Sequence, residues 1–217
     1  MDDRSLYGRS YFTDRHYGLD SKRETQYNLD YRKIVSRVPD GGSILDVGCG
    51  LGVFLNRFLQ SNWKRYGYEV SDFAKNECVE NGITMLESLS TVEEDYFDVV
   101  VYRGTLQHIS NPIDSLYESS RALKHGGLLA ILATPNTNSL GYRRWKTLPA
   151  LDKDRNWVEF SDIMLLNILR RLGYRSIVID YPYGHPYSSP VIDLIRFISG
   201  KPTAFPGNMM EMFAWKD

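Results

Sequence analysis

Residues 43–55 read SILDVGCGLGVFL, in which an apolar predicted strand runs into three glycines and then into a predicted helix over 52–60. Glycine has no Cβ, so the chain can turn sharply there and a ligand can approach the backbone closely. A helix that begins directly after the turn presents free N–H groups to that ligand. The stretch is typical of a nucleotide-binding turn, and the alternative is a glycine-rich turn that binds nothing.

The spacing of these glycines separates one ligand class from others. Gly48, Gly50 and Gly52 follow Asp46 as Asp-x-Gly-x-Gly-x-Gly. A dinucleotide fingerprint would need its third glycine at Val53, and a P-loop would need Gly-Lys-Ser/Thr. The motif resembles motif I of the class I S-adenosylmethionine (SAM) dependent methyltransferases.

This resemblance implies a fold and a cofactor. The expected fold is α/β, a Rossmann-like doubly wound and mostly parallel seven-stranded sheet with an antiparallel C-terminal edge hairpin. The expected cofactor is S-adenosyl-L-methionine, with S-adenosyl-L-homocysteine as its product. The motif I residues expected at the cofactor are Asp46, Gly48, Cys49, Gly50 and Gly52.

Length and composition set further bounds. The chain has 217 residues, enough for one well-buried core but not for two ordinary domains. Its formal net charge is −1, so no global field favours nucleic acid or an anionic membrane. Two scattered cysteines offer neither a disulfide framework nor a zinc site. No run approaches the roughly 18 apolar residues of a membrane span, so we expect a cytoplasmic protein without integral membrane association.

Strand and helix patterns alternate along the chain, which predicts a parallel sheet with its ligand at the carboxyl ends of the strands. The expected strands lie near 43–48, 65–70, 83–86, 97–102, 128–133, 174–181 and 209–216, and the expected helices near 24–38, 52–60, 71–81, 112–124, 161–172 and 190–199. We divide the single domain, residues 1–217, into an N-terminal lid and helix (1–40), a cofactor-binding core (41–135), an acceptor-side insertion (136–160) and a C-terminal part (161–217).

Further cofactor contacts are expected after the second, third and fourth strands. Glu69 could accept both ribose hydroxyls, although a carboxylate at this spacing also serves NAD-binding folds. Glu87, next to Ser88, resembles the family's acidic position beside the adenine amino group, and the alternative is a surface acid. The remaining expected cofactor contacts are Val70, Tyr102 and Arg103.

The fourth strand carries a second resemblance. Residues 97–112, FDVVVYRGTLQHISNP, are similar to a segment of quinone- and sugar-type small-molecule O-methyltransferases. Residues 123–136, LKHGGLLAILATPN, continue that similarity, which covers about residues 40–180. Gln107 stands where the family usually has glutamate, so a role that depends on that acid does not transfer.

His108 is the candidate general base. The sulfonium of SAM already supplies a leaving group, so catalysis needs positioning of the acceptor and removal of a proton from a hydroxyl. His108 lies just beyond the fourth strand, and imidazole titrates near neutral pH. The alternative is that His108 caps the loop or helps to hold the cofactor.

Basic and aromatic residues after the fifth strand are candidates for acceptor binding. Arginines there could bind a phosphate or carboxylate, and tryptophans could stack on a ring. The alternatives are a solvated charged face and ordinary packing. The candidate acceptor contacts after the fifth strand are Arg143, Arg144, Trp145, Arg155 and Trp157, and Tyr11 of the N-terminal lid is a further candidate.

We therefore expect SAM-dependent O-methylation of a small, nucleotide-linked or carrier-linked acceptor. A sugar or surface-polysaccharide intermediate is preferred, and a quinone is the alternative. A non-catalytic SAM-binding protein and an NAD-dependent oxidoreductase stay open. A nucleic-acid partner is not expected, because residues 102–105, YRGT, replace the Asp/Asn-Pro-Pro-Tyr/Phe segment of adenine-N6 enzymes. No metal-binding cluster is evident, and the oligomeric state does not follow from the sequence.

Overall fold

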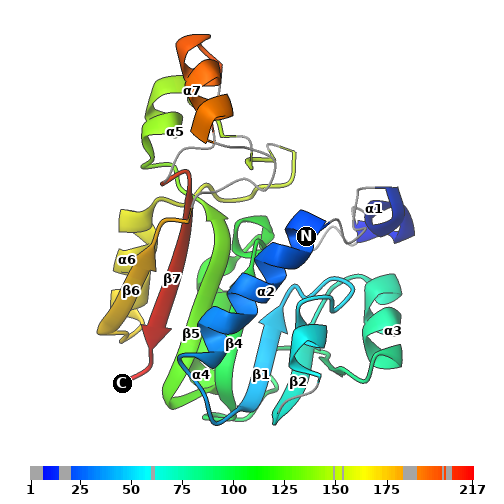
Figure 1. The fold of residues 1–217 in the computed structure, drawn as a ribbon. Helices are drawn as coiled ribbons and strands as arrows, with labels where there is room; N and C mark the ends of the chain where they lie inside the picture. Colours follow the sequence, from blue (N-terminus) through cyan, green and yellow to red (C-terminus); the bar gives the residue numbers. More distant parts are fainter. Residues whose placement is uncertain are drawn as a thin grey trace.

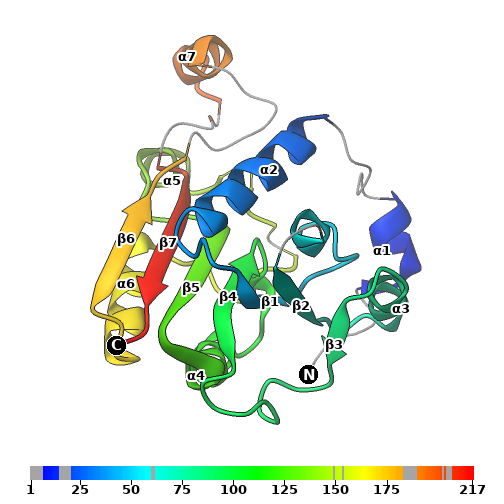
Figure 2. The same ribbon diagram turned by 60° about the horizontal axis from the view of Figure 1, so that its bottom comes forward.

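The computed structural model describes residues 7–14, 21–59, 62–148, 150–152, 154–182, 190–201, 203 and 207–217. Within these residues, seven strands form one sheet in the order β3-β2-β1-β4-β5-β7-β6 (Figures 1 and 2). The strands are β1 (Gly42–Val47), β2 (Trp63–Tyr68), β3 (Thr84–Leu86), β4 (Phe97–Arg103), β5 (Leu123–Pro135), β6 (Ser176–Asp180) and β7 (Met209–Trp215).

The strand directions confirm the predicted fold class. β1 pairs in parallel with β2 and β4, and the pairs β2–β3 and β4–β5 are also parallel. β7 runs antiparallel to both β5 and β6, so the C-terminal edge of the sheet is antiparallel. The strand order reverses between β1 and β4, and this reversal opens a crevice at the carboxyl ends of the parallel strands.

Helices cover both faces of the sheet (Figure 1). One face packs against α2 (Ser21–Val35) and the 3₁₀ helix η2 (Leu55–Phe58), and the other packs against α4 (Pro112–Ala122) and α6 (Asp162–Arg171). In β4, Val99 and Val101 join the core on the α2 side, whereas Val100 joins the core on the α4 side. Side chains alternate along a strand, and both faces are buried in its middle, so residues 99–102 of β4 form an unbroken apolar run.

Four segments differ from the sequence-based prediction. The helix expected over 52–60 is reduced to η2, because Gly52 has φ +71° and cannot continue a right-handed helix. β5 begins five residues earlier than expected, since Leu123 pairs with Phe97 ahead of a bulge. Two short helices form where none was predicted: α1 (Arg9–Asp14) and α5 (Leu140–Trp145). The expected helix over 71–81 corresponds to α3 (Asp72–Glu80).

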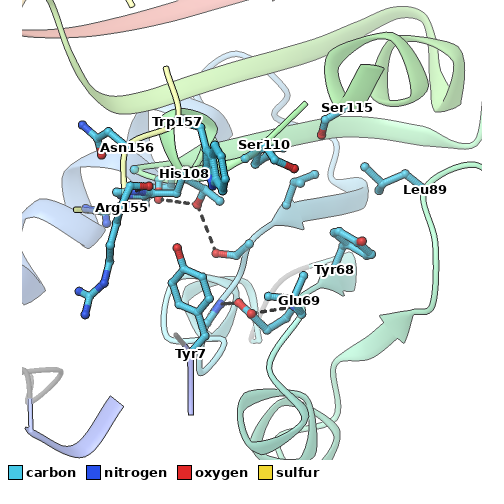
Figure 3. A pocket seen from close by; sticks show the side chains of 18 of the residues that line it. Tyr7, Tyr68, Glu69, Leu89, His108, Ser110, Ser115, Arg155, Asn156 and Trp157 are labelled. Atoms are coloured by element: carbon cyan, nitrogen blue, oxygen red, sulfur yellow. Dashed lines mark hydrogen bonds between the residues drawn. The ribbon is translucent and has the colours of Figure 1, made fainter. Parts of the chain in front are cut away.

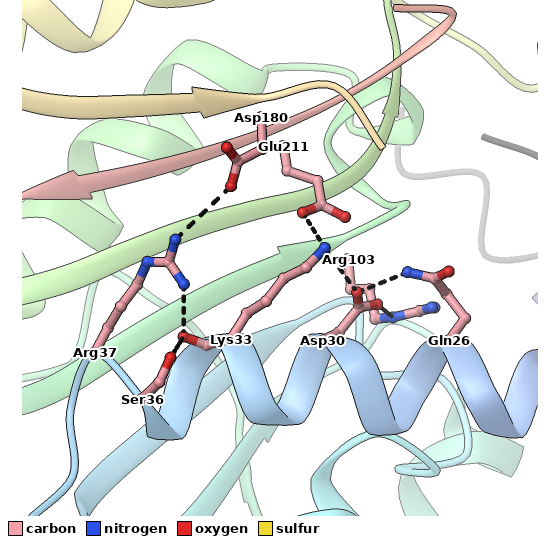
Figure 4. A network of polar contacts seen from close by, with 8 residues as sticks. All are labelled: Gln26, Asp30, Lys33, Ser36, Arg37, Arg103, Asp180 and Glu211. Atoms are coloured by element: carbon pink, nitrogen blue, oxygen red, sulfur yellow. Dashed lines mark hydrogen bonds and ion pairs between the residues drawn. The ribbon is translucent and has the colours of Figure 1, made fainter. Parts of the chain in front are cut away.

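Polar contacts fix α2 to three strands (Figure 4). Asp30 is fully buried and accepts a hydrogen bond from Nε of Arg103, at the end of β4, at 2.8 Å. The guanidinium of Arg103 also lies 4.0 Å from the centre of the Tyr27 ring. Among the described residues, two acid–base pairs join α2 to the sheet, Asp30–Arg103 and Lys33–Glu211, and Arg37 in the turn after α2 pairs with Asp180. These pairs anchor α2 next to the crevice.

Two helices project beyond the ends of β5 and β6 (Figure 1). They are α5 and α7 (Pro190–Ile198), and Nε1 of Trp145 on α5 donates to the carbonyl of Gly200, after α7, at 3.2 Å. No helix in the described part of the chain combines the length and apolar character needed to cross a membrane.

Candidate active site

A cavity of about 530 Å³ lies at the carboxyl ends of the parallel strands (Figure 3). Its floor comes from the segments that follow β1, β2, β3 and β4, around residues 47–50, 68–70, 88–90 and 103–105. Residues 108–110 and 154–157 form another side, and the N-terminal segment contributes Tyr7, Tyr11 and Phe12. The cavity therefore combines the crevice at the strand ends of the doubly wound sheet with segments from elsewhere in the chain.

The three glycines of the turn have different roles. Gly48 and Gly50 line the cavity with φ of +77° and +54°, a conformation that favours glycine. Gly52 is outside the cavity lining, and a Cβ there would lie 2.4 Å from Cδ1 of Ile83. Gly52 thus permits close packing under the turn. Cys49 is also outside the lining, and its sulfur lies 3.8 Å from that of Cys78.

Glu69 is oriented by the backbone around it. Its carboxylate accepts hydrogen bonds from the N–H groups of Gly50 at 2.9 Å, Val70 at 2.7 Å and Ser71 at 3.0 Å. An ionised carboxylate has about four acceptor positions, so three bonds leave acceptor capacity for a ligand. Glu69, Val70 and Gly50 all line the cavity. This cradle of backbone and carboxylate fits the paired hydroxyls of a ribose.

Asp46 is a buried acid just before the turn. Its Oδ1 has no hydrogen-bond partner, and the residue does not itself line the cavity. Burial raises the pKa of Asp46 to about 7; Arg103 opposes this increase, and Glu69 adds to it. Asp46 is therefore a group whose ionisation is costly inside the fold.

His108 and the loop 154–158 form the side of the cavity across from Glu69 (Figure 3). Nδ1 of His108 lies 3.2 Å from the carbonyl oxygen of Arg155, and burial lowers the pKa of the imidazole, although this hydrogen bond partly opposes the shift. The N–H of Trp157 donates to the carbonyl of Gln107 at 2.9 Å. These contacts attach the loop to the 3₁₀ helix η3 (Leu106–His108), which follows β4.

The N-terminal segment covers this side of the cavity. The rings of Tyr7 and Tyr11 meet edge to face, 5.1 Å apart between centroids. The guanidinium of Arg155 lies 4.8 Å from the centre of the Tyr11 ring. Aromatic side chains and one cation thus face the space next to His108. Residues 1–6 and 15–20 of the predicted lid are outside the described part of the chain.

Asn156 is a polar cavity residue that the sequence did not single out. Neither Oδ1 nor Nδ2 of its buried amide has a hydrogen-bond partner, and the nearby Oε1 of Gln107 is also unpartnered. A buried amide without partners is costly, so a ligand that offers a donor and an acceptor would relieve that cost. An asparagine in a loop carries no sequence signal of such a role. Tyr7 and Thr105 are further cavity residues that we did not select.

The structure brings ten of the predicted site residues together and leaves others outside. Those that line the cavity are Gly48, Gly50, Glu69, Val70, Ser88, Arg103, His108, Tyr11, Arg155 and Trp157. Glu87 is outside, because its side chain is 90% exposed and lies 3.9 Å from Lys75. Tyr102 also points away, since its hydroxyl bonds with Ser115 and Ser119 on α4.

Three predicted acceptor contacts are carried away from the cavity by α5. Arg143 and Arg144 are exposed on this helix, outside the cavity lining. Trp145 packs against α7, with its ring centroid 5.8 Å from that of Phe197. The sequence placed these residues in an acceptor-side insertion that contacts the acceptor, but none of the three lines the cavity. Among the described residues, no group of three or more His, Cys, Asp or Glu side chains could hold a metal ion.

Comparisons with known proteins agree with this geometry. A family model described as a methyltransferase domain matches residues 19–182. A ubiquinone biosynthesis O-methyltransferase of Haemophilus ducreyi is 29% identical over 116 residues, which cover 47% of this chain and 49% of that protein. The match therefore spans about half the length of that curated relative.

Solved structures share the fold. A SAM-dependent methyltransferase from Archaeoglobus fulgidus superimposes with a TM-score of 0.67 at 20% identity, covering 95% of this chain and 99% of that one. Phosphoethanolamine N-methyltransferase 2 of Haemonchus contortus, in complex with S-adenosyl-L-methionine, gives a TM-score of 0.61 at 16% identity, covering 87% of this chain and 52% of that one.

Proposed function

Because the chain belongs to the methyltransferase domain family and has the fold of a class I SAM-dependent methyltransferase, we propose that it methylates a hydroxyl group of a small aromatic acceptor. SAM is the cofactor, and when bound it supplies an electrophilic methyl group on a sulfonium. The observation that carries the proposal is the position of His108, which lies beside Trp157 and lines the same cavity as the Glu69 cradle (Figure 3).

The cofactor half of the cavity supports this assignment. We assign Glu69 to the ribose hydroxyls, because its carboxylate is already oriented by three backbone donors and keeps acceptor capacity. Gly48 and Gly50 allow a ligand to approach the backbone after β1. Ser88 and Leu89, after β3, line the part of the cavity that we assign to the adenine.

His108 is suited to removing the proton of an acceptor hydroxyl. Its Nδ1 faces a carbonyl oxygen, which only accepts, so Nδ1 carries the proton and Nε2 is the basic atom. Burial keeps the imidazole neutral near pH 7 by lowering its pKa. A hydroxyl acceptor needs such a base because it becomes a good nucleophile only as its proton leaves.

The lining next to His108 favours an aromatic acceptor of the quinone type. Tyr7, Tyr11 and Trp157 offer ring faces and edges, and Arg155 supplies a cation for an acidic substituent. The sugar or polysaccharide acceptor expected from the sequence drew on basic residues, of which Arg143 and Arg144 lie outside the cavity and Arg155 lines it. It stays as a second candidate, because the unpartnered amide of Asn156 could bind sugar hydroxyls.

Two measurements test the proposal. In thermal unfolding, SAM and S-adenosylhomocysteine should raise the Tm of the protein, whereas NAD and NADP should not, because a ligand stabilises only the state that binds it. S-adenosylhomocysteine release should then be followed with a panel of dihydroxylated aromatic acids and nucleotide sugars. Equal Tm shifts from NAD would refute the cofactor assignment. Tight SAM binding without turnover on any acceptor would favour a non-catalytic SAM-binding protein.

A further inference from the structure

Helix α7 presents an apolar stripe to solvent. Val191, Leu194, Ile195 and Ile198 recur at positions i, i+3, i+4 and i+7, so they share one face of the helix. Their exposed fractions are 68%, 55%, 60% and 77%. Large apolar side chains gathered in this way on a surface mark an interaction site.

The opposite face of α7 is held by the protein. Asp193 on that face is fully buried. The ring of Phe197 packs edge to face against Trp145 of α5, and the indole N–H of Trp145 donates to the carbonyl of Gly200. The stripe is thus the outer face of an anchored helix, which projects beyond the ends of β5 and β6 (Figure 1).

Exposed cations lie on α7 and on the neighbouring α5. Five exposed cations lie on α5, on α7 or just after these helices: Arg143, Arg144, Lys146, Arg196 and Lys201. The acid on the same segments is Asp193, which is buried. Exposed cations therefore outnumber exposed acids on these segments, where Tyr142 of α5 contacts the exposed Glu159, although the whole chain has a formal net charge of −1.

We propose that α7 and its basic surroundings dock the protein onto a membrane surface that contains anionic lipids. An amphipathic helix with an apolar face and a cationic border lies in the interface plane, with the apolar face among the acyl chains and the cations at the headgroups. The charge favours this occupant over a second copy of the chain, because a symmetric contact through α7 would bring two sets of cations together.

The position of the helix gives such docking a consequence for the site. α5 and α7 follow the carboxyl end of β5 and the end of β6, and the cavity opens at the carboxyl ends of the parallel strands. Docking would therefore hold this end of the sheet near the lipid surface. The inference depends on the surface of α7 and not on the acceptor proposed above.

Vesicle flotation tests the inference with the full chain. We expect binding to vesicles of phosphatidylcholine with added phosphatidylglycerol, weaker binding to phosphatidylcholine alone, and loss of binding as salt is raised. The triple variant Leu194→Ser, Ile195→Ser, Ile198→Ser should bind the anionic vesicles about tenfold more weakly or worse. The matched control is Ile163→Ser with Met164→Ser, which removes exposed apolar side chains from α6 and should bind as the wild type does.

Two further measurements test whether the triple variant has lost its fold or changed its oligomeric state. The SAM-induced Tm shift should be the same in all variants, which shows that the folded core is intact. Light scattering after size exclusion reports the oligomeric state. Unchanged vesicle binding by the triple variant, or equal binding to both kinds of vesicle, would overturn the inference. So would a dimer that the triple variant dissociates without any vesicle binding, because a second copy would then cover α7.

Discussion

The side-chain nitrogen of Gln107 lies 3.3 Å from Nε2 of His108 and donates to the carbonyl oxygen of Gly104 at 3.0 Å. Since Nδ1 of His108 faces the carbonyl of Arg155, the ring is held at both nitrogens. The amide of Gln107 donates toward Nε2, which identifies Nε2 as the acceptor atom of a neutral imidazole; an acceptor hydroxyl would replace this amide at the single lone pair of Nε2. The glutamine that departs from the family pattern therefore contacts the candidate base directly.

Replacing His108 by alanine should separate catalysis from cofactor binding. If His108 removes the acceptor proton, His108→Ala lowers kcat by roughly 10²–10⁴-fold and leaves the Kd for SAM nearly unchanged. The residual activity should rise with pH, because the acceptor then ionises without help. Steady-state kinetics and calorimetric titration with SAM measure the two effects. Wild-type turnover in this variant would limit the mechanism to positioning.

Gln107→Glu should shift the acidic limb of the pH profile. In the wild type, burial lowers the pKa of His108 below its ordinary value of about 6.5, so kcat/KM should fall only at pH values below that. A carboxylate next to the ring favours the imidazolium and should move this limb upward by roughly one pH unit. The matched control is Gln107→Met, which adds no charge. An identical acidic limb in both variants would show that another group controls the profile.

Glu69→Ala should weaken SAM binding by roughly 2–3 kcal/mol, because it removes charge-assisted bonds to the ribose. Glu69 also organises the Gly50 turn, so the Tm of the ligand-free variant must be measured beside its Kd. Glu87→Ala is the control, since the exposed Glu87 lies outside the cavity lining and its loss should leave the Kd unchanged. Equal losses in both variants would contradict the assignment of the ribose to Glu69.

The parts of the fold that could be predicted are those with a local signal. β4 begins at Phe97 as predicted and contains the apolar run 99–102, and α4 begins at Pro112 as predicted, with proline in its first turn. The helix expected to begin at Gly52 failed, because Gly52 adopts a left-handed conformation, and its lack of a Cβ leaves room for Ile83. That packing is a tertiary contact, and residues 52–60 carry no trace of it.

In the candidate site, too, the residues with a local sequence signal could be predicted and those positioned by tertiary contacts could not. Gly48, Gly50 and Glu69 were found because the cofactor cradle follows consecutive strands, whose ends must meet at one edge of the sheet. The acceptor side depends on how loop 154–158 docks against Gln107 and on which way α5 directs its side chains. Basic and aromatic composition alone could not distinguish Arg155, which lines the cavity, from Arg143, which does not.

Gly50→Val should abolish the SAM-induced Tm shift. The substitution places a branched side chain at the cavity wall and strains a residue with φ +54°. Gly126→Val is the matched control: Gly126 has φ +73°, and a Cβ there meets nothing within 4 Å. Both variants should lose stability without ligand, but the control should keep its SAM response. A retained SAM shift in Gly50→Val would mean that the cofactor does not approach this turn.

The free energy of unfolding of the Asp46→Asn variant, measured relative to that of the wild type, should increase as the pH rises. Burial raises the pKa of the folded-state carboxyl to about 7, above the unfolded value of about 3.9. The stability contributed by this protonated group is complete below the unfolded pKa and is lost as pH rises through 7. The asparagine variant avoids that loss, so its advantage in free energy of unfolding should grow by roughly 3 kcal/mol between about pH 5 and pH 8.

Urea unfolding at these two pH values measures the change, and Asp98→Asn provides a control of opposite sign. Although burial of Asp98 acts against it, hydrogen bonds from Lys124 and Ser43 lower the pKa of this carboxyl. Its stabilisation is therefore present above the unfolded pKa and is lost in acid, so Asp98→Asn should be less stable than the wild type at both test values. A stability difference for Asp46→Asn that does not change with pH would mean that Asp46 is already ionised in the folded protein at pH 5, with Arg103 as its compensating charge.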